Sequence, residues 1–150
     1  MTMEATIAEK FHSLLNYLLY TKVEFEIVAD EVGDSRLRTA LYGFSEESDI
    51  YITELCAHLQ SLGFEYQYQH ILPVISAPIE LSSSFTANEK GNELQSICAA
   101  SEKSITATYY DILNSYFPFP VIREIMTYQL NTLRSILDKI CFLNSARFSN

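Results

Sequence analysis

The chain has 150 residues, of which 48% are hydrophobic, with ten Tyr, nine Phe and no Trp. This length fits one domain covering residues 1–150, and the apolar content is sufficient for a buried core. The net charge of −9 argues against a protein that binds the phosphate backbone of a duplex, because such binding depends on lysine and arginine. Only four Gly and four Pro favour long helices over a fold of strands and turns.

The cysteine pattern and the N-terminus indicate the compartment. Cys56, Cys98 and Cys141 are odd in number and far apart, and no CxxC motif occurs, which indicates buried thiols in a reducing compartment. The N-terminal stretch contains Glu4 and Glu9 and lacks the basic region and cleavable apolar core of a signal peptide. No apolar run reaches the roughly 18 residues that a membrane span requires. We therefore expect a cytoplasmic protein with no nucleic-acid partner and no membrane partner.

Two helices are predicted in the first half, at about 6–32 and 35–62. In both segments inward positions recur at steps of three and four, as on the buried stripe of a bundle helix. The expected inward residues are Ile7, Phe11, Leu14, Leu18, Thr21, Phe25, Val28 and Val32 in the first helix, and Leu37, Leu41, Phe44, Ser48, Tyr51, Leu55, His58 and Leu62 in the second.

Glycines mark the ends of these two segments. Gly33 and Gly63 stand directly after these segments, where the chain often takes a positive φ that glycine adopts at little cost. Asp34 or Ser35 can then cap the second helix. Because the intervening loop has only two or three residues, the two helices are expected to be antiparallel neighbours.

Two more helices are predicted in the second half, at about 88–116 and 120–145. The run Phe117-Pro118-Phe119-Pro120 separates them, and Pro120 fits the first turn of a helix, where its missing N–H costs nothing. The expected inward residues are Leu94, Cys98, Glu102, Ile105, Tyr109, Ile112 and Tyr116 in the third helix, and Ile122, Met126, Gln129, Leu133, Ile136, Ile140 and Leu143 in the fourth.

The two halves are similar around their breaks, at a constant spacing of 85 residues. This similarity indicates a repeat of helical hairpins, although any two amphipathic hairpins can show it. The residues that correspond are Ile27, Val28, Leu37 and Leu41 in the first half and Ile112, Leu113, Ile122 and Met126 in the second.

The connection over 63–87 determines how the hairpins are joined. A helix of ~28 residues is ~42 Å long, whereas a connection of ~23 residues spans up to ~75 Å when extended. The connection can therefore run the whole length of the bundle and make the second and third helices parallel. We expect two antiparallel helical hairpins joined by a long crossover, the topology of ferritin-like bundles.

Four stretches carry a family resemblance. The second segment contains LRTALYGFSEESDIYITELCAHLQSLG, where an acidic pair precedes an aromatic residue and a Glu-Leu. The connection contains PIELSSSF, the third segment ICAASEKSITATYYDIL with a Glu and a Tyr seven residues apart, and the last segment QLNTLRSILDKICFL. Together these stretches resemble a small bacterial group of ferritin-like four-helix bundles of uncharacterised function. The wider ferritin-like superfamily implies a di-metal carboxylate site where the ligands are present.

Such bundles hold two metals with a Glu from each of two helices and a Glu-x-x-His pair from each of the other two. Residues i and i+3 share a helix face, which explains the spacing. The candidate ligands of this chain include no Glu-x-x-His pair. The nearest arrangement is Glu54 and His58, four residues apart, which form one polar strip with Glu47 and Tyr51.

Glu102 is the most specific single candidate, because it lies on an inward stripe between Cys98 and Ile105. A buried carboxylate is costly unless it is paired, protonated or bound to a metal. One interpretation is a metal ligand. The alternatives are a hydrogen-bonded pair with a Tyr or with Gln129 of the fourth helix, or a carboxylate at the edge of the stripe that reaches water.

Glu24 on the first helix is the remaining candidate ligand, with a solvated carboxylate as the alternative. The resembling group has a His directly before the Asp of its last helix, whereas this chain has Leu137 before Asp138. That departure removes the best ligand from the fourth helix.

Two functions follow. The favoured one is a non-catalytic binding or assembly protein with a degenerate metal site and no cofactor, present as a homo-oligomer such as a dimer. Aromatic residues in FEYQYQH and YYDILNSYFPFP gather at helix ends and suggest a self-association surface. The alternative is a metal-binding or iron-oxidising ferritin-like protein whose di-metal site holds iron or manganese through Glu102, Glu24, Glu47, Glu54 and His58.

Overall fold

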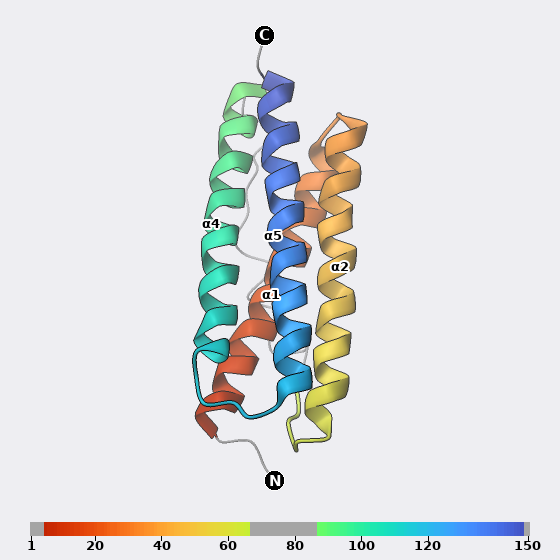
Figure 1. The fold of residues 1–150 in the computed structure, drawn as a ribbon. Helices are drawn as coiled ribbons and strands as arrows, with labels where there is room; N and C mark the ends of the chain where they lie inside the picture. The colour runs from red at the N-terminus through yellow and green to blue at the C-terminus, as the bar shows by residue number, and fades with distance from the viewer. Residues whose placement is uncertain (1–4, 67–86, 149–150) are drawn as a thin grey trace.

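Figure 1 shows a computed structural model of the chain, which describes residues 5–66 and 87–148, with side chains for 6–66 and 94–146. The described residues form four helices and no strand, which confirms the prediction of an all-α four-helix bundle. None of the helices in these ranges is both long and apolar enough to cross a membrane. The connection predicted over 63–87 lies largely outside the described residues. The helices are α1 (Ala5–Glu31), α2 (Ser35–Gln60), α4 (Ala87–Leu113) and α5 (Pro120–Phe148).

Each helix packs against two neighbours. α1 contacts α2 and α4, and α5 contacts the same two helices from the other side. The predicted stripes form the core between them, and all eight inward residues expected on α1 are buried. Each large apolar side chain removed from water contributes about 1.5–3 kcal/mol, so the stripes are the main source of stability. The largest fully buried side chains are Tyr109, Phe11, Phe25, Phe44, Leu14, Leu15, Leu18, Leu37, Leu41, Ile52, Leu55 and Leu59.

Two of the expected inward residues are exposed. Tyr116 is 85% exposed, because α4 ends at Leu113 and the chain beyond it no longer follows the helical stripe. Phe117 is buried in its place. His58 is also exposed, in the last turn of α2. Both failures occur at helix ends, where periodicity does not indicate the path of the chain.

The helix ends combine expected and unexpected caps. Asp34 caps α2, since its carboxylate accepts hydrogen bonds from the backbone N–H groups of Arg36 and Leu37, both at 3.0 Å. Gly63 has φ 82°, as predicted for a glycine after a helix. Gly33 lacks the expected positive φ. At that end of α1 the guanidinium of Arg38 instead donates to the carbonyl oxygen of Val32, at 3.0 and 2.5 Å.

In the second hairpin an arginine likewise donates to a backbone carbonyl at a helix end. The guanidinium of Arg123 donates to the carbonyl oxygen of Leu113 at 2.5 Å, at the end of α4. Arg38 and Arg123 are each the fourth residue of the second helix of their hairpin, and they are 85 residues apart. This is the spacing that relates the two halves of the sequence. Each arginine supplies a donor to a carbonyl that has no partner within its own helix.

Candidate functional site

A chain of buried hydrogen bonds crosses the core and joins three helices. The hydroxyl of Tyr109 on α4 donates to Oε1 of Gln129 on α5 at 2.9 Å. Nε2 of Gln129 in turn donates to Oε1 of Glu54 on α2, also at 2.9 Å. Tyr109 and Gln129 are fully buried, and Glu54 is half-buried. Because a side-chain amide has both a donor and an acceptor, Gln129 can satisfy a hydroxyl and a carboxylate at once.

Burial fixes the protonation state of the tyrosines around this chain. It raises the pKa of Tyr109 well above its usual value, and the nearby Tyr51 and Glu54 raise it further. Burial also raises the pKa of Tyr51, and its contact with Glu47 adds to the effect. Both hydroxyls therefore keep their protons at neutral pH. Neither hydroxyl can therefore act as a base, and that of Tyr109 serves as a hydrogen-bond donor.

Glu102 occupies the edge of the core, which is one of the alternatives raised by the sequence. Its side chain is 34% exposed, and Oε1 lies 3.7 Å from Nε of Arg134 on α5. Gln129, which the sequence interpretation considered as a partner for Glu102, bonds Glu54 and Tyr109 instead. Glu102 is therefore compensated by a cation and by water, and its burial does not require a metal.

Glu24 is the most deeply buried of the candidate carboxylates, at 9% exposure on α1. Burial raises the pKa of its carboxyl from 4.5 to about 7. Its neighbour Glu26 is more exposed and pairs with Lys22 at 3.2 Å. Of the two acidic residues that flank Phe25, Glu24 is thus the inward one.

The five candidate ligands do not lie together. Glu24 and Glu102 both lie close enough to Cys98 to raise its pKa, whereas Glu54 lies beside Tyr109, about 16 Å further along α4. His58 and Glu47 occupy the surface and the edge of α2. Within the described side chains, no group of three or more His, Cys, Asp or Glu is arranged to hold a metal ion. The assignment of these residues as ligands remains a prediction.

The sequence interpretation missed two features. One Glu-x-x-His sequence does occur, from Glu9 to His12 on α1, and its spacing was sufficient to find it. In the structure Glu9 is exposed, and the His12 ring packs on Phe64 with ring centroids 4.6 Å apart. The second feature is a polar contact between α4 and α5, where Nδ2 of Asn144 donates to Oε1 of Gln95 at 3.2 Å. No local sequence signal marks that pair.

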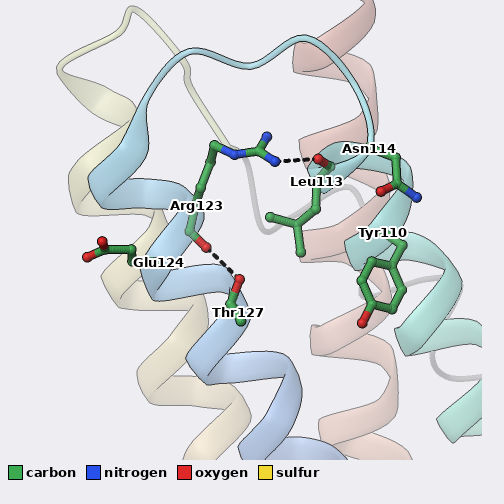
Figure 2. Close-up of a pocket in the computed structure, with 6 residues that line it drawn as sticks. All are labelled: Tyr110, Leu113, Asn114, Arg123, Glu124 and Thr127. Atoms are coloured by element: carbon green, nitrogen blue, oxygen red, sulfur yellow. Dashed lines mark hydrogen bonds between the residues drawn. The ribbon is translucent and has the colours of Figure 1, made fainter.

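An open hollow of about 440 Å³ lies between the end of α4 and the start of α5. Figure 2 shows the Arg123 guanidinium bonded to the Leu113 carbonyl across this hollow, and Thr127 Oγ1 donating to the Arg123 carbonyl at 2.9 Å. The Arg123 guanidinium is thus already used to hold the two helix ends together, and the Thr127 hydroxyl bonds a carbonyl of its own helix. Its lining residues are Tyr110, Leu113, Asn114, Arg123, Glu124 and Thr127.

No protein-family model, no curated protein and no solved structure matches the chain. The resemblance to ferritin-like bundles therefore stays a prediction.

Replacing Gln129 tests the buried hydrogen-bond chain. Gln129→Leu keeps the volume and leaves the hydroxyl of Tyr109 and one oxygen of Glu54 without their partner. We expect a loss of about 2–3 kcal/mol in the free energy of unfolding, since each orphaned buried polar group costs about 1–3 kcal/mol. Urea unfolding followed by circular dichroism measures it. With Tyr109→Phe added, the loss should be smaller than the sum of the two single losses, and strictly additive losses would contradict the coupling.

Replacing Glu24 tests its burial. Its pKa is about 7 in the folded chain and near the usual 4.5 when unfolded, so the folded state binds more protons between these values. The free energy of unfolding should therefore fall as the pH rises from about 4.5 through 7. Glu24→Gln should remove this slope and stabilise the chain above pH 7 by about 1–3 kcal/mol, after allowance for solvent screening.

Thermal and urea unfolding between pH 4 and 8 measure the effect of Glu24→Gln. Glu26→Gln is the matched control, because it removes the same charge two residues away from a more exposed site that pairs with Lys22. An equal gain from both variants would show that net charge, and not burial, is responsible.

Proposed function

We propose that the protein is a cytoplasmic, ferritin-like four-helix bundle without catalytic activity that functions by association. The first partner is a second copy of the chain, bound through the outward face of α5. The observation that carries the proposal is a row of large apolar side chains on this face, at Val121, Tyr128 and Phe142.

The ferritin-like part of the proposal is supported by the helix directions in Figure 1. The colour of the ribbon shows α2 and α4 running the same way along the bundle, and α1 and α5 running the opposite way. A chain with this order needs a connection as long as the bundle between α2 and α4. The 26 residues between Gln60 and Ala87 are sufficient for it.

The apolar row follows a heptad spacing. Val121 and Tyr128 are seven residues apart, Tyr128 and Phe142 fourteen apart, and each is more than 60% exposed. An α-helix drifts only about 20° per heptad, so the three side chains lie on one side of α5. The helix has 29 residues and is about 44 Å long. That length suits an interface of ordinary size, in which each partner buries about 800 Å².

Charge favours a second copy at this face. α5 carries four basic residues against two acidic ones, whereas acidic residues outnumber basic ones in each of α1, α2 and α4. Two chains of net charge −9 therefore repel each other least when they meet along α5.

An antiparallel pair of α5 helices about a two-fold axis is also complementary in detail. When Val121 lies opposite Phe142 of the second copy, Glu124 lies opposite Lys139 of that copy, because both pairs have the same sum of residue numbers. The two-fold axis forms each of these contacts twice. Val121 and Phe142 then meet at both ends of the pair, Tyr128 lies opposite Ser135, and the opposite charges of Glu124 and Lys139 meet.

The core supports a non-catalytic function over the metal-binding alternative. Glu54 accepts a hydrogen bond from Gln129, and Glu102 pairs with Arg134. The fourth helix presents Leu137 to the core, where the resembling group has a histidine ligand. These carboxylates are held by protein partners, as expected for a site that has lost its metal.

Association through α5 predicts the effect of a charge on this face. Phe142→Glu changes a side chain that is 70% exposed, so it should leave the fold intact and convert a dimer to a monomer. Burying the new carboxylate opposite an apolar partner would be costly. Sedimentation equilibrium at high micromolar concentration measures the mass.

Ile50→Glu on α2 is the matched control, since Ile50 is 55% exposed on another helix and the variant adds the same charge. It should sediment like the wild type. A monomeric wild type at these concentrations would refute the proposal, as would equal dissociation of both variants.

A further inference from the structure

Two cysteine side chains face each other across the α4–α5 packing surface. Cys98 on α4 is fully buried, Cys141 on α5 is half-buried, and both are reduced. The two thiols lie close enough for each to shift the pKa of the other. From the sequence they were expected to be separate buried thiols, because they are 43 positions apart.

The register of the two helices places these residues opposite each other. Gln95 of α4 bonds Asn144 of α5, and further along the helix Tyr109 bonds Gln129. Numbers rise along α4 as they fall along α5, so the helices run antiparallel at this surface. Cys98 and Cys141 each lie three residues inside the Gln95–Asn144 contact. The pairing of the thiols therefore follows from the packing of the helices.

We propose that Cys98 and Cys141 form a redox modification site, in which a hydroperoxide oxidises the two thiols to a disulfide that links α4 to α5. The disulfide would join the two helices of the second hairpin covalently at the end away from their short connection. Reduction by a dithiol restores the thiols.

The reaction has two steps. The thiolate of Cys141, the more exposed sulfur, attacks one oxygen of hydrogen peroxide; the O–O bond breaks, and the leaving hydroxide takes up a proton to become water. The product is a sulfenic acid on Cys141. The sulfur of Cys98 then attacks the sulfur of Cys141, the S–O bond breaks, and the hydroxyl leaves with the Cys98 proton as a second water. The two thiols lose two electrons, and the peroxide gains them.

The surroundings of the two thiols slow their oxidation near neutral pH, and the rate of oxidation increases at higher pH. Burial raises the pKa of both thiols, and neighbouring carboxylates raise it further, from Glu24 on α1, Glu102 on α4 and Asp138 on α5. The nearby Cys98 thiol acts in the opposite direction on Cys141 and lowers its pKa. Cys141 is thus the thiol that ionises first. Since the thiolate is the nucleophile, the rate should keep rising with pH above 8.

The experiment treats the folded full-length chain with hydrogen peroxide, quenches it with a thiol alkylating agent and analyses it by mass spectrometry without reduction. We expect each monomer to carry one alkyl group, on Cys56, and otherwise to weigh two hydrogens less than the untreated chain. Trypsin should then release one crosslinked species made of Gly91–Lys103, which contains Cys98, and Ile140–Arg147, which contains Cys141. Dithiothreitol should reverse the change, and oxidation should raise Tm by several degrees.

Two variants serve as controls. Cys56→Ser removes the remaining thiol and should give the same crosslink at the same rate. Cys98→Ser should give oxygen addition on Cys141 and no loss of hydrogen. Circular dichroism before oxidation checks that each variant is folded.

Several results would overturn the proposal. One is oxygen addition at Cys141 in the folded wild type with Cys98 left as a free thiol. Others are a crosslink that involves Cys56, one that joins two chains, or one that forms only in denaturant. Thiols that stay unmodified across the pH range would also refute it.

Discussion

One buried amide holds three helices of this bundle in register. Gln129 lies in the core of α5, and its amide connects a hydroxyl of α4 to a carboxylate of α2. A polar group left without a partner in the core costs free energy that is a large fraction of a small domain's net stability. A sliding or rotated α5 would break both bonds at once, so the amide specifies one arrangement of the apolar stripes. The stripes supply most of the energy and the amide supplies the specificity.

The same chain of bonds explains why the centre of the bundle is a poor place for chemistry. Its tyrosine keeps its proton, its carboxylate already has a donor, and its glutamine binds metals poorly. Glu102, the residue that most resembles a ligand in the sequence, reaches the surface and Arg134. The features that remain for function lie away from this centre. They are the outward face of α5, where charge is least negative, and the thiol pair where α4 and α5 pack.

Much of the fold could be predicted from the sequence, because a bundle helix carries its buried face as a local repeat. The stripe of α1 was predicted residue by residue, and the bounds of α2 and α5 to within a few residues. The prediction failed at helix ends. Tyr116 follows the last turn of α4, and Gly33 takes no positive φ. At that end Arg38 donates to the nearby carbonyl of Val32.

The candidate site was less predictable, because it depends on which side of each helix meets which neighbour. Periodicity places Gln129 and Glu102 on inward stripes but does not reveal that Gln129 turns toward α2 while Glu102 turns toward Arg134. The contact between Cys98 and Cys141 likewise depends on the register of α4 against α5, which no local pattern encodes. Glu9 and His12 are a different case, because their Glu-x-x-His spacing was readable in the sequence and was overlooked.

The most direct measurement is elemental analysis of the untagged protein after incubation with Fe²⁺ and removal of the excess. If the core carboxylates are held by Gln129 and Arg134, the protein should retain no iron above the level of a control protein of similar charge, and its Tm should not change with added Fe²⁺ or Mn²⁺. Retention of about two metal ions per chain, the content of a ferritin-like di-metal site, would contradict this account.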